Sequence, residues 1–597
     1  MSEAVETGKA APLLGVSQSV SGKAWLQRPA DESSVAEMAR IAGIPELLAQ
    51  VLIARGIGVD DAQRHLDPKL RDYFPDPSSF ADMDKAAAAI WDAVQAGKSL
   101  AVFADYDVDG GTSAAQLIRY FRGLGHKLDL YVPDRVAEGY GPSKEAFEAL
   151  RKRGADFVIT VDCGATAGDA LEAARALALD VVVVDHHQMG TDLPPALAVI
   201  NPNRPDDMSG CGHMAAAGVT FILLAALNRE GRRRGVFNES QEPDLFDFID
   251  LAALGTVCDV VSLTGVNRAI VAQGLKAMGG WRNIGLKALA DVSGVTSAPG
   301  TYHAGFLIGP RINAGGRVGR ADLGARLLST DDANEAAQIA HELDVLNKER
   351  REIEADVLDA AIAQIESSGS GNMPILVASG PDWHPGVIGV AAGRIKERYG
   401  RPSIVIGVAD GIGKGSGRSV PGVDLGSAIS AARDDGLLTA GGGHAMAAGL
   451  TVDENKIDAL TNYLADRLAP EFARAGDAMA LKLDGLLSPA SANEAFLTQL
   501  QAAGPFGQGN GEPRFAMPNV RVVYAERVGG VHVRFSLAGE TGDRISGIAF
   551  RAGDGPLGEA LLSGEQNVWH AAGRLKLDEW RGRRRVDFHL EDLAAAN

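Results

Sequence analysis

Short apolar runs alternate with helical patterns through the first half of the chain, and each run stops abruptly at polar residues or glycine. Runs bounded in this way are typical of buried strands in a parallel sheet. The helical stretches between most of them predict βαβ units, whose ligands lie at the carboxyl ends of the strands. The predicted strands are one that starts at Ser99 and those at residues 128–132, 157–161, 181–184 and 198–200.

The segments around this sheet follow a helical period. Residues 45–55, 59–66 and 83–95 are predicted to be helices, whereas residues 1–33 lack periodicity and are predicted to be a disordered tail. A long charged pattern from 331 to about 365 predicts a connector helix with solvent on two sides.

The last third of the chain changes character twice. A second α/β pattern begins at Pro374, and beyond Ala478 five short alternating strands with Gly-rich turns are typical of an oligonucleotide-binding (OB) barrel. These strands are expected at residues 520–524, 532–537, 545–550, 568–575 and 585–590. We therefore expect an α/β multidomain protein with a tail (1–33), a helical segment (34–80), a parallel-sheet domain (81–330), a connector helix (331–367), a smaller α/β domain (368–477) and a β-barrel (478–597).

Composition excludes several classes of protein. The chain is 46% hydrophobic, and no apolar run approaches the length of a membrane span or a signal peptide, so we expect a cytoplasmic location. Three cysteines exclude a disulfide framework and a Cys-rich zinc module. The net charge of −19 argues against indiscriminate binding of polyanions but leaves room for a local basic groove.

Three carboxylates follow the first strand at alternating positions, Asp105, Asp107 and Asp109. Carboxylates crowded at the end of a buried strand repel one another unless a cation neutralises them. Because hard oxygen ligands favour Mg²⁺ or Mn²⁺, the stretch predicts a divalent-metal site. An acidic turn or a helix cap is the alternative, which accounts for one of these aspartates but poorly for three.

Two later strand ends and one further segment add the same chemistry. Strand 157–161 ends in Asp162, strand 181–184 ends in the Asp-His-His of residues 185–187, and Asp259 lies between apolar residues further on. Each has an ordinary alternative role, as a helix cap, a backbone hydrogen-bond partner or a buried ion pair. Together on one sheet edge, they suffice for two octahedral cations bridged by a shared carboxylate.

The second α/β domain and the barrel carry features suited to nucleic acid. Gly-rich loops at residues 414–419 and 441–445, which bear Lys, Ser, Arg and His, let backbone amides and a guanidinium approach a phosphate closely. Flexible turns are the alternative. In the barrel, arginines 581 and 583–585 suit a phosphate backbone, and five aromatic residues are candidates for base stacking: Phe535, Phe550, Trp569, Trp580 and Phe588. Core packing is the alternative for most of them, and Trp580, beside the arginines, is the best candidate for DNA binding.

The chain resembles the DHH phosphoesterase superfamily through four motifs in the family's order: ADYDVDGGTS, VDCG, DHH and GTVCDVV. The sequence GGGH is similar to the signature of the DHH-associated second domain, and GPFGQGN to the hinge before the barrel of RecJ-type nucleases. From about residue 35 to 595 the chain resembles the RecJ family of bacterial 5′-to-3′ exonucleases specific for single-stranded DNA.

This resemblance implies a hydrolase of DNA repair and recombination that uses two divalent cations, Mn²⁺ or Mg²⁺. The implied metal ligands are Asp105, Asp107, Asp109, Asp162, His186 and Asp259, with Asp162 as the bridge. The implied catalytic residues are Asp185, His187 and His444. The implied substrate-binding residues are Arg135, Arg311, Asn313, Arg317, Ser416, Arg418, Gly442 and Gly443. A helicase and a single-strand-binding protein are the implied partners, and we expect a monomer. Gly111 and Cys163 depart from the family pattern without removing a ligand.

Two rival functions remain open at this point. Smaller relatives in the superfamily hydrolyse short oligoribonucleotides or cyclic dinucleotides, but they lack the N-terminal helices and the barrel. The superfamily also includes a replication scaffold that has lost its metal ligands, against which the complete ligand set argues.

Overall fold

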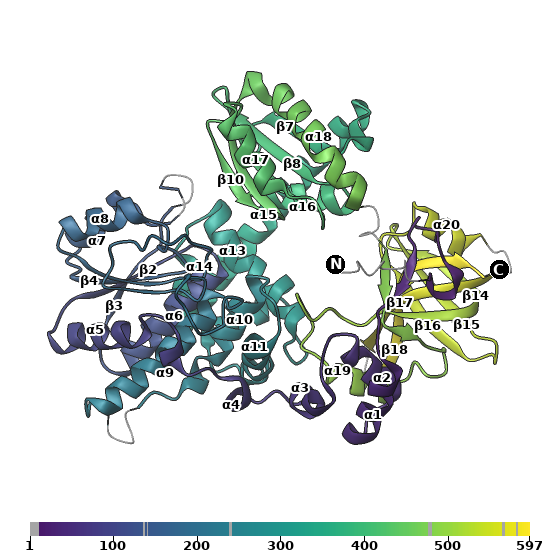
Figure 1. Ribbon diagram of the computed structural model, residues 1–597, viewed down its shortest axis with the longest axis horizontal. Helices are drawn as coiled ribbons and strands as arrows, with labels where there is room; N and C mark the ends of the chain where they lie inside the picture. The colour runs from purple at the N-terminus through teal and green to yellow at the C-terminus, as the bar shows by residue number, and fades with distance from the viewer. Residues whose placement is uncertain are drawn as a thin grey trace, which may run out of the picture. The chain divides into compact units, whose positions relative to one another are not determined.

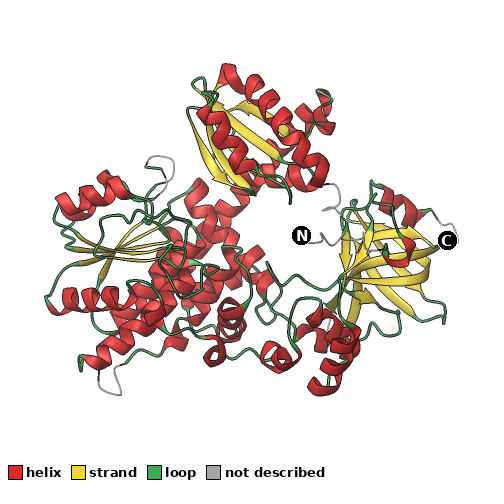
Figure 2. Ribbon diagram, viewed as in Figure 1, coloured by secondary structure: helices red, strands yellow, loops and turns green. Residues whose placement is uncertain are grey.

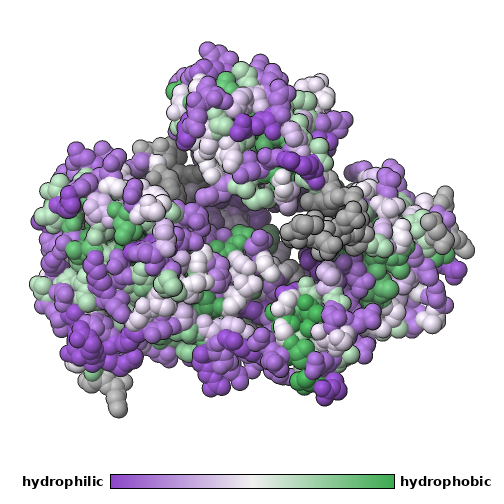
Figure 3. Space-filling view, viewed as in Figure 1, coloured by the Kyte–Doolittle hydropathy of each residue, from purple (hydrophilic) through white to green (hydrophobic). Residues whose placement is uncertain are grey.

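The computed structural model describes residues 11–134, 138–139, 141–237, 242–475, 480–563, 567–580 and 583–596. The chain forms two compact units: Tyr73–Ala478 makes one, and Met1–Asp72 joins Met479–Asn597 in the other. On the face seen in Figure 3, hydrophilic residues prevail on both units and apolar residues are interspersed among them. Among the described helices, none combines the length and apolar character that crossing a membrane requires.

The first unit begins with a five-stranded sheet in the order β3-β2-β4-β5-β6, and every neighbouring pair is parallel. Its strands are β2 (Leu100–Ala104), β3 (Leu128–Tyr131), β4 (Phe157–Val161), β5 (Asp180–Val184) and β6 (Ala198–Ile200). The predicted parallel sheet is therefore confirmed. Strands β2 and β4 are buried along their whole length, which explains why they are apolar without alternation.

Helices cover both faces of this sheet (Figures 1 and 2). On one face, Phe103 of β2 packs beside Phe147 of α7, with ring centroids 6.3 Å apart. On the other face lie α5 and α6, which contact β6 and β2 respectively. The helices around the sheet are α5 (Met83–Gln95), α6 (Val108–Gly123), α7 (Lys144–Lys152), α8 (Gly168–Ala176) and α9 (Ala216–Arg233).

A group of helices completes the first domain and leads to the second. They are α10 (Ile249–Cys258), α11 (Gly265–Met278), α12 (Ile284–Val292), the π-helix η5 (His303–Ile308), α13 (Gly309–Val318), α14 (Leu323–Ser329) and α15 (Ala333–Ser367). Helix α10 packs against α6, α9 and α11. Helix α15 is the long element expected as a connector, and it contacts both α13 and α16.

The second α/β domain is a five-stranded mixed sheet in the order β10-β11-β9-β8-β7. Helices α15 and α16 pack on one face of it, and α17 and α18 on the other. Its elements are β7 (Leu376–Pro381), α16 (Ile388–Tyr399), β8 (Ser403–Ala409), β9 (Ile412–Arg418), α17 (Leu425–Asp434), β10 (Ala440–His444), β11 (Ala447–Asp453) and α18 (Ile457–Arg474).

The other unit is a β-barrel with an N-terminal helical segment packed onto it. The five predicted strands are present in the order β14-β15-β16-β18-β17, and pairing of β14 with β17 closes the barrel. The strands of this unit are β1 (Trp25–Gln27), β12 (Leu481–Leu483), β13 (Gly485–Leu486), β14 (Phe515–Val528), β15 (His532–Ala538), β16 (Arg544–Ala549), β17 (Val568–Trp580) and β18 (Arg583–Ala595). Its helices are α1 (Glu32–Ala42), α2 (Glu46–Ile53), α3 (Ala62–Leu66), α19 (Glu494–Gln501) and α20 (Pro556–Leu562), and α4 (Leu70–Tyr73) leads out of it.

The predicted N-terminal tail is wrong for residues 11–33. Strand β1 pairs in parallel with β12, and Trp25 is fully buried among Leu481, Leu483 and Ala594. Its indole Nε1 donates to Asp592 Oδ2 at 3.0 Å. A three-residue strand is too short to produce a periodic signal, so the partner that orders it, more than 450 residues later, could not be recognised from the sequence.

We therefore predict that Trp25→Ala lowers the free energy of unfolding of the barrel unit by about 3–5 kcal/mol, the usual cost of truncating a buried aromatic residue. Gln27→Ala, on the same strand with an exposed side chain, should change it by less than about 0.5 kcal/mol. Urea titration read by proteolysis of the full chain measures both. Equal midpoints for the Trp25 variant and the wild type would contradict the buried position of β1.

Candidate active site

The register of the parallel sheet brings three aspartates to one edge. Ala104, Val161 and Val184 are the last residues of β2, β4 and β5, and they lie side by side. The next residue of each strand is therefore placed at the same edge: Asp105, Asp162 and Asp185. All three are buried. Asp162 has a φ of +60°, a left-handed conformation that aspartate tolerates better than most residues.

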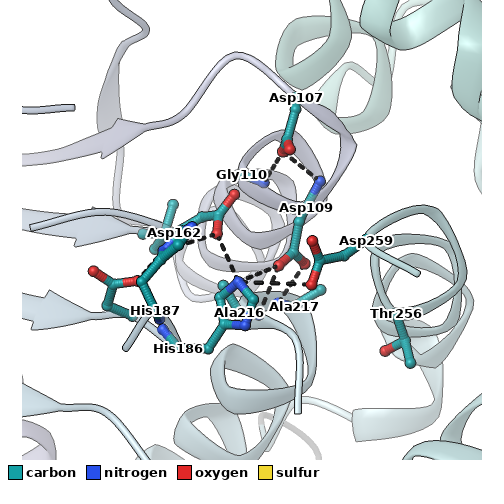
Figure 4. A network of polar contacts seen from close by, with 12 residues as sticks. Asp107, Asp109, Gly110, Asp162, His186, His187, Ala216, Ala217, Thr256 and Asp259 are labelled. Carbon is teal, nitrogen blue, oxygen red and sulfur yellow. Dashed lines mark hydrogen bonds and ion pairs between the residues drawn. The ribbon is translucent and has the colours of Figure 1, made fainter. Parts of the chain in front are cut away.

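The helix that follows β2 begins on two further aspartates (Figure 4). Asp107 caps α6, because its carboxylate accepts from the backbone amides of Asp109 at 2.9 Å and Gly110 at 3.1 Å. Asp109 in turn accepts from the amides of Ala216 at 2.7 Å and Ala217 at 2.8 Å, at the start of α9. Backbone dipoles thus orient both carboxylates. Both carboxylates keep lone pairs available for a metal ion, since a carboxylate can accept several bonds.

The sixth ligand candidate reaches the cluster from a helix. Asp259 follows the last residue of α10 and caps its C-terminal end. The expectation that it belongs to the same sheet edge is corrected here, since α10 carries it to the strand ends from beside the sheet. Its Oδ2 is buried and has no hydrogen bond in the described structure, and it lies 3.6 Å from His186 Nε2. A buried carboxylate oxygen in this state is suited to a cation.

His186 lies at the centre of the cluster. Its Nε2 is 3.3 Å from Asp162 Oδ1 and 3.7 Å from Asp109 Oδ2, while a bond to the Met214 backbone orients the ring. Burial, and next the charge of His187, lower the pKa of His186 to about 4. The imidazole is therefore neutral at physiological pH, the form that binds a metal.

His187 has a different environment. Its Nδ1 is 2.7 Å from Asp185 Oδ1. Burial lowers the pKa of His187, but the bond to Asp185 and the charges of Asp185, Asp259 and Asp105 together raise it above its ordinary value. Asp185 is buried as well, yet hydrogen bonding to His187 and to backbone amides lowers its pKa to about 2. The two residues form an ion pair beside the ligand cluster, and Asp185 serves to hold His187.

Burial raises the pKa of three carboxylates of the cluster. Those of Asp109 and Asp162 lie well above the ordinary value, and that of Asp259 is about 7, in each case through burial first and neighbouring aspartates next. Among the described residues, three groups have ligand atoms within 4.8 Å of one another: Asp162 with His186 and His187, Asp109 with His186 and Asp259, and Asp105 with Asp107 and Asp162. The donors are mainly carboxylate oxygens, so the set fits hard divalent cations such as Mn²⁺ and Mg²⁺.

Helix α13 connects this cluster to the rest of its unit. Asn313 Oδ1 accepts from the Val108 amide at 3.1 Å and so braces the aspartate loop. Arg317 Nη1 donates to the Gly386 carbonyl of the second domain at 3.1 Å. Arg311 is buried and bonds Asp344 of α15 at 2.9 Å. In the structure, Arg311 thus joins α13 to α15.

The predicted residues of the second domain share one face of its sheet. Residue pairing places His444, Ala447 and Arg418 in one row across β10, β11 and β9, and Gly442, Gly449 and Ser416 in the next row. Side chains two residues apart on a strand point to the same face. Arg418 Nη1 donates to Ser416 Oγ at 3.1 Å.

The start of α16 lies against this same face. A Cβ on Gly389, in the first turn of the helix, would be 2.9 Å from Ser416 Oγ and 3.0 Å from Arg418 Nη2. By contrast, a Cβ at Gly442 or Gly449 would meet no atom within 4 Å. The sheet surface at Gly442 and Gly449 is therefore free of side chains, and it lies beside a helix N-terminus, a serine and an arginine. This arrangement is suited to a phosphate. The left-handed φ of Gly443, +152°, requires glycine.

The barrel aromatics divide by burial. Phe535 and Phe588 are buried and Trp569 packs against the barrel core, whereas Phe550 is 56% exposed, with His532 and His589 edge-on to its ring. Core packing is thus correct for the first three, and Phe550 is the exposed member. Arg135, Arg581 and the side chains of Trp580 and Arg583 lie outside the described residues.

Comparison with known proteins assigns the chain to a family. The DHH family, N-terminal domain, matches residues 99–256, the DHHA1 domain matches 372–469 and the RecJ OB domain matches 483–592. The chain is 34% identical to the single-stranded-DNA-specific exonuclease RecJ of Escherichia coli, over 92% of this chain and 96% of that one. The RecJ of Bacillus subtilis is 32% identical, over 96% and 70%. The chain belongs to the RecJ family.

Solved RecJ structures support the same fold and the same donor set. RecJ from Thermus thermophilus in complex with Mn²⁺ matches with a TM-score of 0.79 and 31% identity, covering 95% of this chain and 78% of that one. Its complex with Mg²⁺ matches with a TM-score of 0.73 and 29% identity, covering 96% and 78%. RecJ structures therefore exist with both cations that the donor set of this chain favours.

Several contributors to the site lie outside the motifs that sequence patterns reveal. Met214, Ala216 and Ala217 act through their backbone and carry no chemical signal in their side chains. Gly255 acts by having no side chain: a Cβ there would be 2.5 Å from Thr112 Oγ1 and 2.8 Å from Asp109 Oδ1. Helix α10 can approach α6 only because this position is glycine.

We predict that Gly255→Ala weakens Mn²⁺ binding about 10- to 100-fold, as disturbing the support of metal ligands usually does, because the new methyl group displaces Asp109. Gly123→Ala is the control. Gly123 is the last residue of α6, the helix that carries Asp109, and a Cβ there would meet no atom within 4 Å. Isothermal titration calorimetry with Mn²⁺ measures both variants. Wild-type affinity in the Gly255 variant would show that Asp109 is not held in the way described.

Proposed function

We propose that this protein is a metal-dependent exonuclease that degrades single-stranded DNA from the 5′ end, in DNA repair and recombination. The observation that carries the proposal is the convergence of five carboxylates and a neutral histidine on one buried cluster. Its curated relatives are single-stranded-DNA-specific exonucleases. A match to the RecJ OB domain favours this function over hydrolysis of short oligoribonucleotides or cyclic dinucleotides, and the complete ligand set favours it over a scaffold.

Two divalent cations, Mn²⁺ or Mg²⁺, would be held by Asp105, Asp107, Asp109, Asp162, His186 and Asp259. When bound, they supply positive charge that polarises the scissile phosphodiester and favours ionisation of the attacking water. Asp162 is the proposed bridge, because it belongs to two of the three donor groups and offers two oxygens. The bond between the Met214 backbone and His186 keeps the Nε2 of that ring directed at the cluster.

His187 is the proposed contact to the scissile phosphate. Its bond to Asp185 favours the protonated ring, which can donate to a phosphoryl oxygen and stabilise the charge that develops there. Asp185 acts as a positioning residue. On the second domain, His444, Arg418 and Ser416 would contact the phosphates of the strand from the face that they share. Arg317, Asn313, Gly442 and Gly443 would position that face and the metal loop, and Arg135 is a further candidate contact.

A 5′-terminal phosphate is the proposed ligand of Ser416, Arg418 and the first turn of α16. A terminal monophosphate carries more charge and one more exposed oxygen than an internal diester. Charge-assisted bonds and a helix N-terminus therefore favour an end over the interior of the strand. A fixed distance between this anchor and the metal ligands would set how many nucleotides separate the end from the cut.

The barrel is proposed to add affinity for the strand without taking part in the chemistry. Its exposed Phe550 can stack on a base, and Arg534, Arg584 and Arg585 are exposed arginines on its strands. We propose the domain limits 34–80, 81–330, 331–367, 368–477 and 478–597 as functional divisions. A cytoplasmic monomer that works with a helicase and a single-strand-binding protein completes the proposal.

We expect Asp162→Asn to reduce exonuclease activity by ~10³-fold or more, because several kcal/mol of charge stabilisation depends on the bridging carboxylate. Asparagine tolerates the left-handed backbone at this position. Stability without metal should be equal or higher, since a buried carboxylate among carboxylates is removed. Release of labelled nucleotide and the thermal midpoint are the measurements, and Asp192→Asn, at an exposed loop position, is the control. Full activity would refute the bridge.

Arg418→Ala should lower degradation of 5′-phosphorylated strands more than that of 5′-hydroxyl strands, narrowing the preference about tenfold, a typical effect of losing a hydrogen bond to a charged group. Mn²⁺ binding should not change. The measurement is the ratio of initial rates at one ionic strength, because salt alone shifts affinity for nucleic acid steeply. Arg394→Ala, a half-exposed arginine on α16 paired with Glu397, serves as the control. An unchanged ratio would mean that this face does not bind the end.

A further inference from the structure

Two exposed aromatic side chains lie on a segment that contacts α10, the helix that leads into Asp259. Tyr302 is 60% exposed and Phe306 is 66% exposed. Their rings are nearly parallel, at 19°, with centroids 5.5 Å apart. Exposed apolar residues are common one at a time, but two stacked aromatic rings form a defined flat surface. We call this pair the Tyr302–Phe306 platform.

The platform is carried by a segment packed directly on the helix that ends at a metal ligand. Phe306 lies in the π-helix η5, which contacts α10. The Cys258 thiol donates to the Ala304 carbonyl at 3.5 Å, and a Cβ on Gly305 would be 3.5 Å from Val257 Cγ1. Because Cys258 immediately precedes Asp259, η5 is fixed against the last turn before the ligand. Short π-helical segments occur frequently at functional sites.

A strained residue adds to the apolar surface at this end of α10. Val260 directly follows Asp259, has a φ of +60° and is 65% exposed. A left-handed backbone is uncommon for a β-branched residue and persists only where its surroundings enforce it. The rim of a cluster built from carboxylates therefore carries a valine and, on the neighbouring segment, two aromatic rings. Such apolar side chains offer nothing that binds a phosphate group, whereas the faces of nucleobases can pack against them.

We propose that the Tyr302–Phe306 platform stacks on an unpaired base of the DNA strand close to the metal centre and thereby positions the strand for cleavage. This inference rests on the proposed exonuclease function. In a duplex, both faces of each interior base are already stacked on neighbouring bases, so a platform that requires a free face favours single strands. Aromatic stacking does not depend on base identity, because every base has a π-face. A nuclease that degrades any sequence needs this independence from sequence.

The test distinguishes stacking of the platform on a DNA base from a purely structural role of Phe306 within the protein. It does so by changing the protein and the substrate together. Phe306→Ala and the milder Phe306→Leu are assayed on 5′-phosphorylated strands with an abasic site at successive positions from the 5′ end. Phe246→Ala is the matched control, because Phe246 is 50% exposed in η4 (Leu245–Asp247), just before the opposite end of α10. Mn²⁺ binding and the thermal midpoint of each variant establish that fold and metal site are intact.

The Phe306 variants should lower kcat/KM on intact strands about 5- to 150-fold, the range expected for loss of one base stack. One abasic position should reduce the wild-type rate by a similar factor and have little further effect on the variants. Phe246→Ala should behave as wild type. Tyr302→Phe should keep the wild-type rate, and Tyr302→Ala should not.

Equal losses on intact and abasic strands at every position would overturn the proposal. So would wild-type rates of the Phe306 variants on DNA alone, the result expected if the platform docks another protein. Failure of the exonuclease function itself would be distinguishable, since the wild-type protein would then release no nucleotide from either substrate. If Phe306→Ala fails to fold, Phe306→Leu supplies the same comparison.

Discussion

Repulsion between buried carboxylates is the constraint around which the catalytic unit is arranged. Asp105, Asp107 and Asp162 form one group with ligand atoms within 4.8 Å of one another, and Asp109 and Asp259 form another with His186. Burial with mutual repulsion raises the pKa of Asp109, Asp162 and Asp259. Without compensation, such a group opposes folding. Two divalent cations held by these residues would reverse the sign of the interaction, because each would be attracted to every ionised ligand. Their positive charge would then offset the repulsion that the carboxylates exert on one another.

The fold holds these groups together by means that are largely local. The in-register ends of β2 and β4 place Asp105 and Asp162, and amides at the start of α6 and α9 orient Asp107 and Asp109. Close approach of α10 to α6 depends on Gly255, and the turn before α6 on Gly110, where a Cβ would be 2.8 Å from the Asp105 amide nitrogen. Backbone dipoles and absent side chains orient the ligands without adding positively charged groups that would compete with the cations.

Much of this could be predicted from the sequence, and the limits have physical reasons. The strand ends that carry Asp162 and Asp185 are visible because a buried parallel strand leaves a continuous apolar run that stops at a polar residue. Asp259 was expected at the same sheet edge because its apolar neighbours hide the helical period of α10, a helix buried on all sides. Arg311 matched a phosphate-binding pattern, but its buried pairing with Asp344 depends on tertiary contacts. Strand β1 is too short to have a period.

Helix α13 carries residues predicted to clamp a phosphate, and its contacts in the structure suit a second role, as a brace. Asn313 bonds the Val108 amide and so braces the aspartate loop, a Cβ on Gly316 would be 2.8 Å from Tyr106 Cβ, and Arg317 bonds the Gly386 carbonyl shortly before α16. One helix thus contacts the loop that carries three proposed ligands and the segment leading to the face that carries Ser416 and Arg418. A substitution in α13 would disturb both the proposed metal site and the proposed terminal-phosphate site. The resulting loss of activity would resemble the loss expected if α13 bound the phosphate directly. Loss of activity alone cannot distinguish the two roles, whereas a change in Mn²⁺ affinity without DNA identifies the brace.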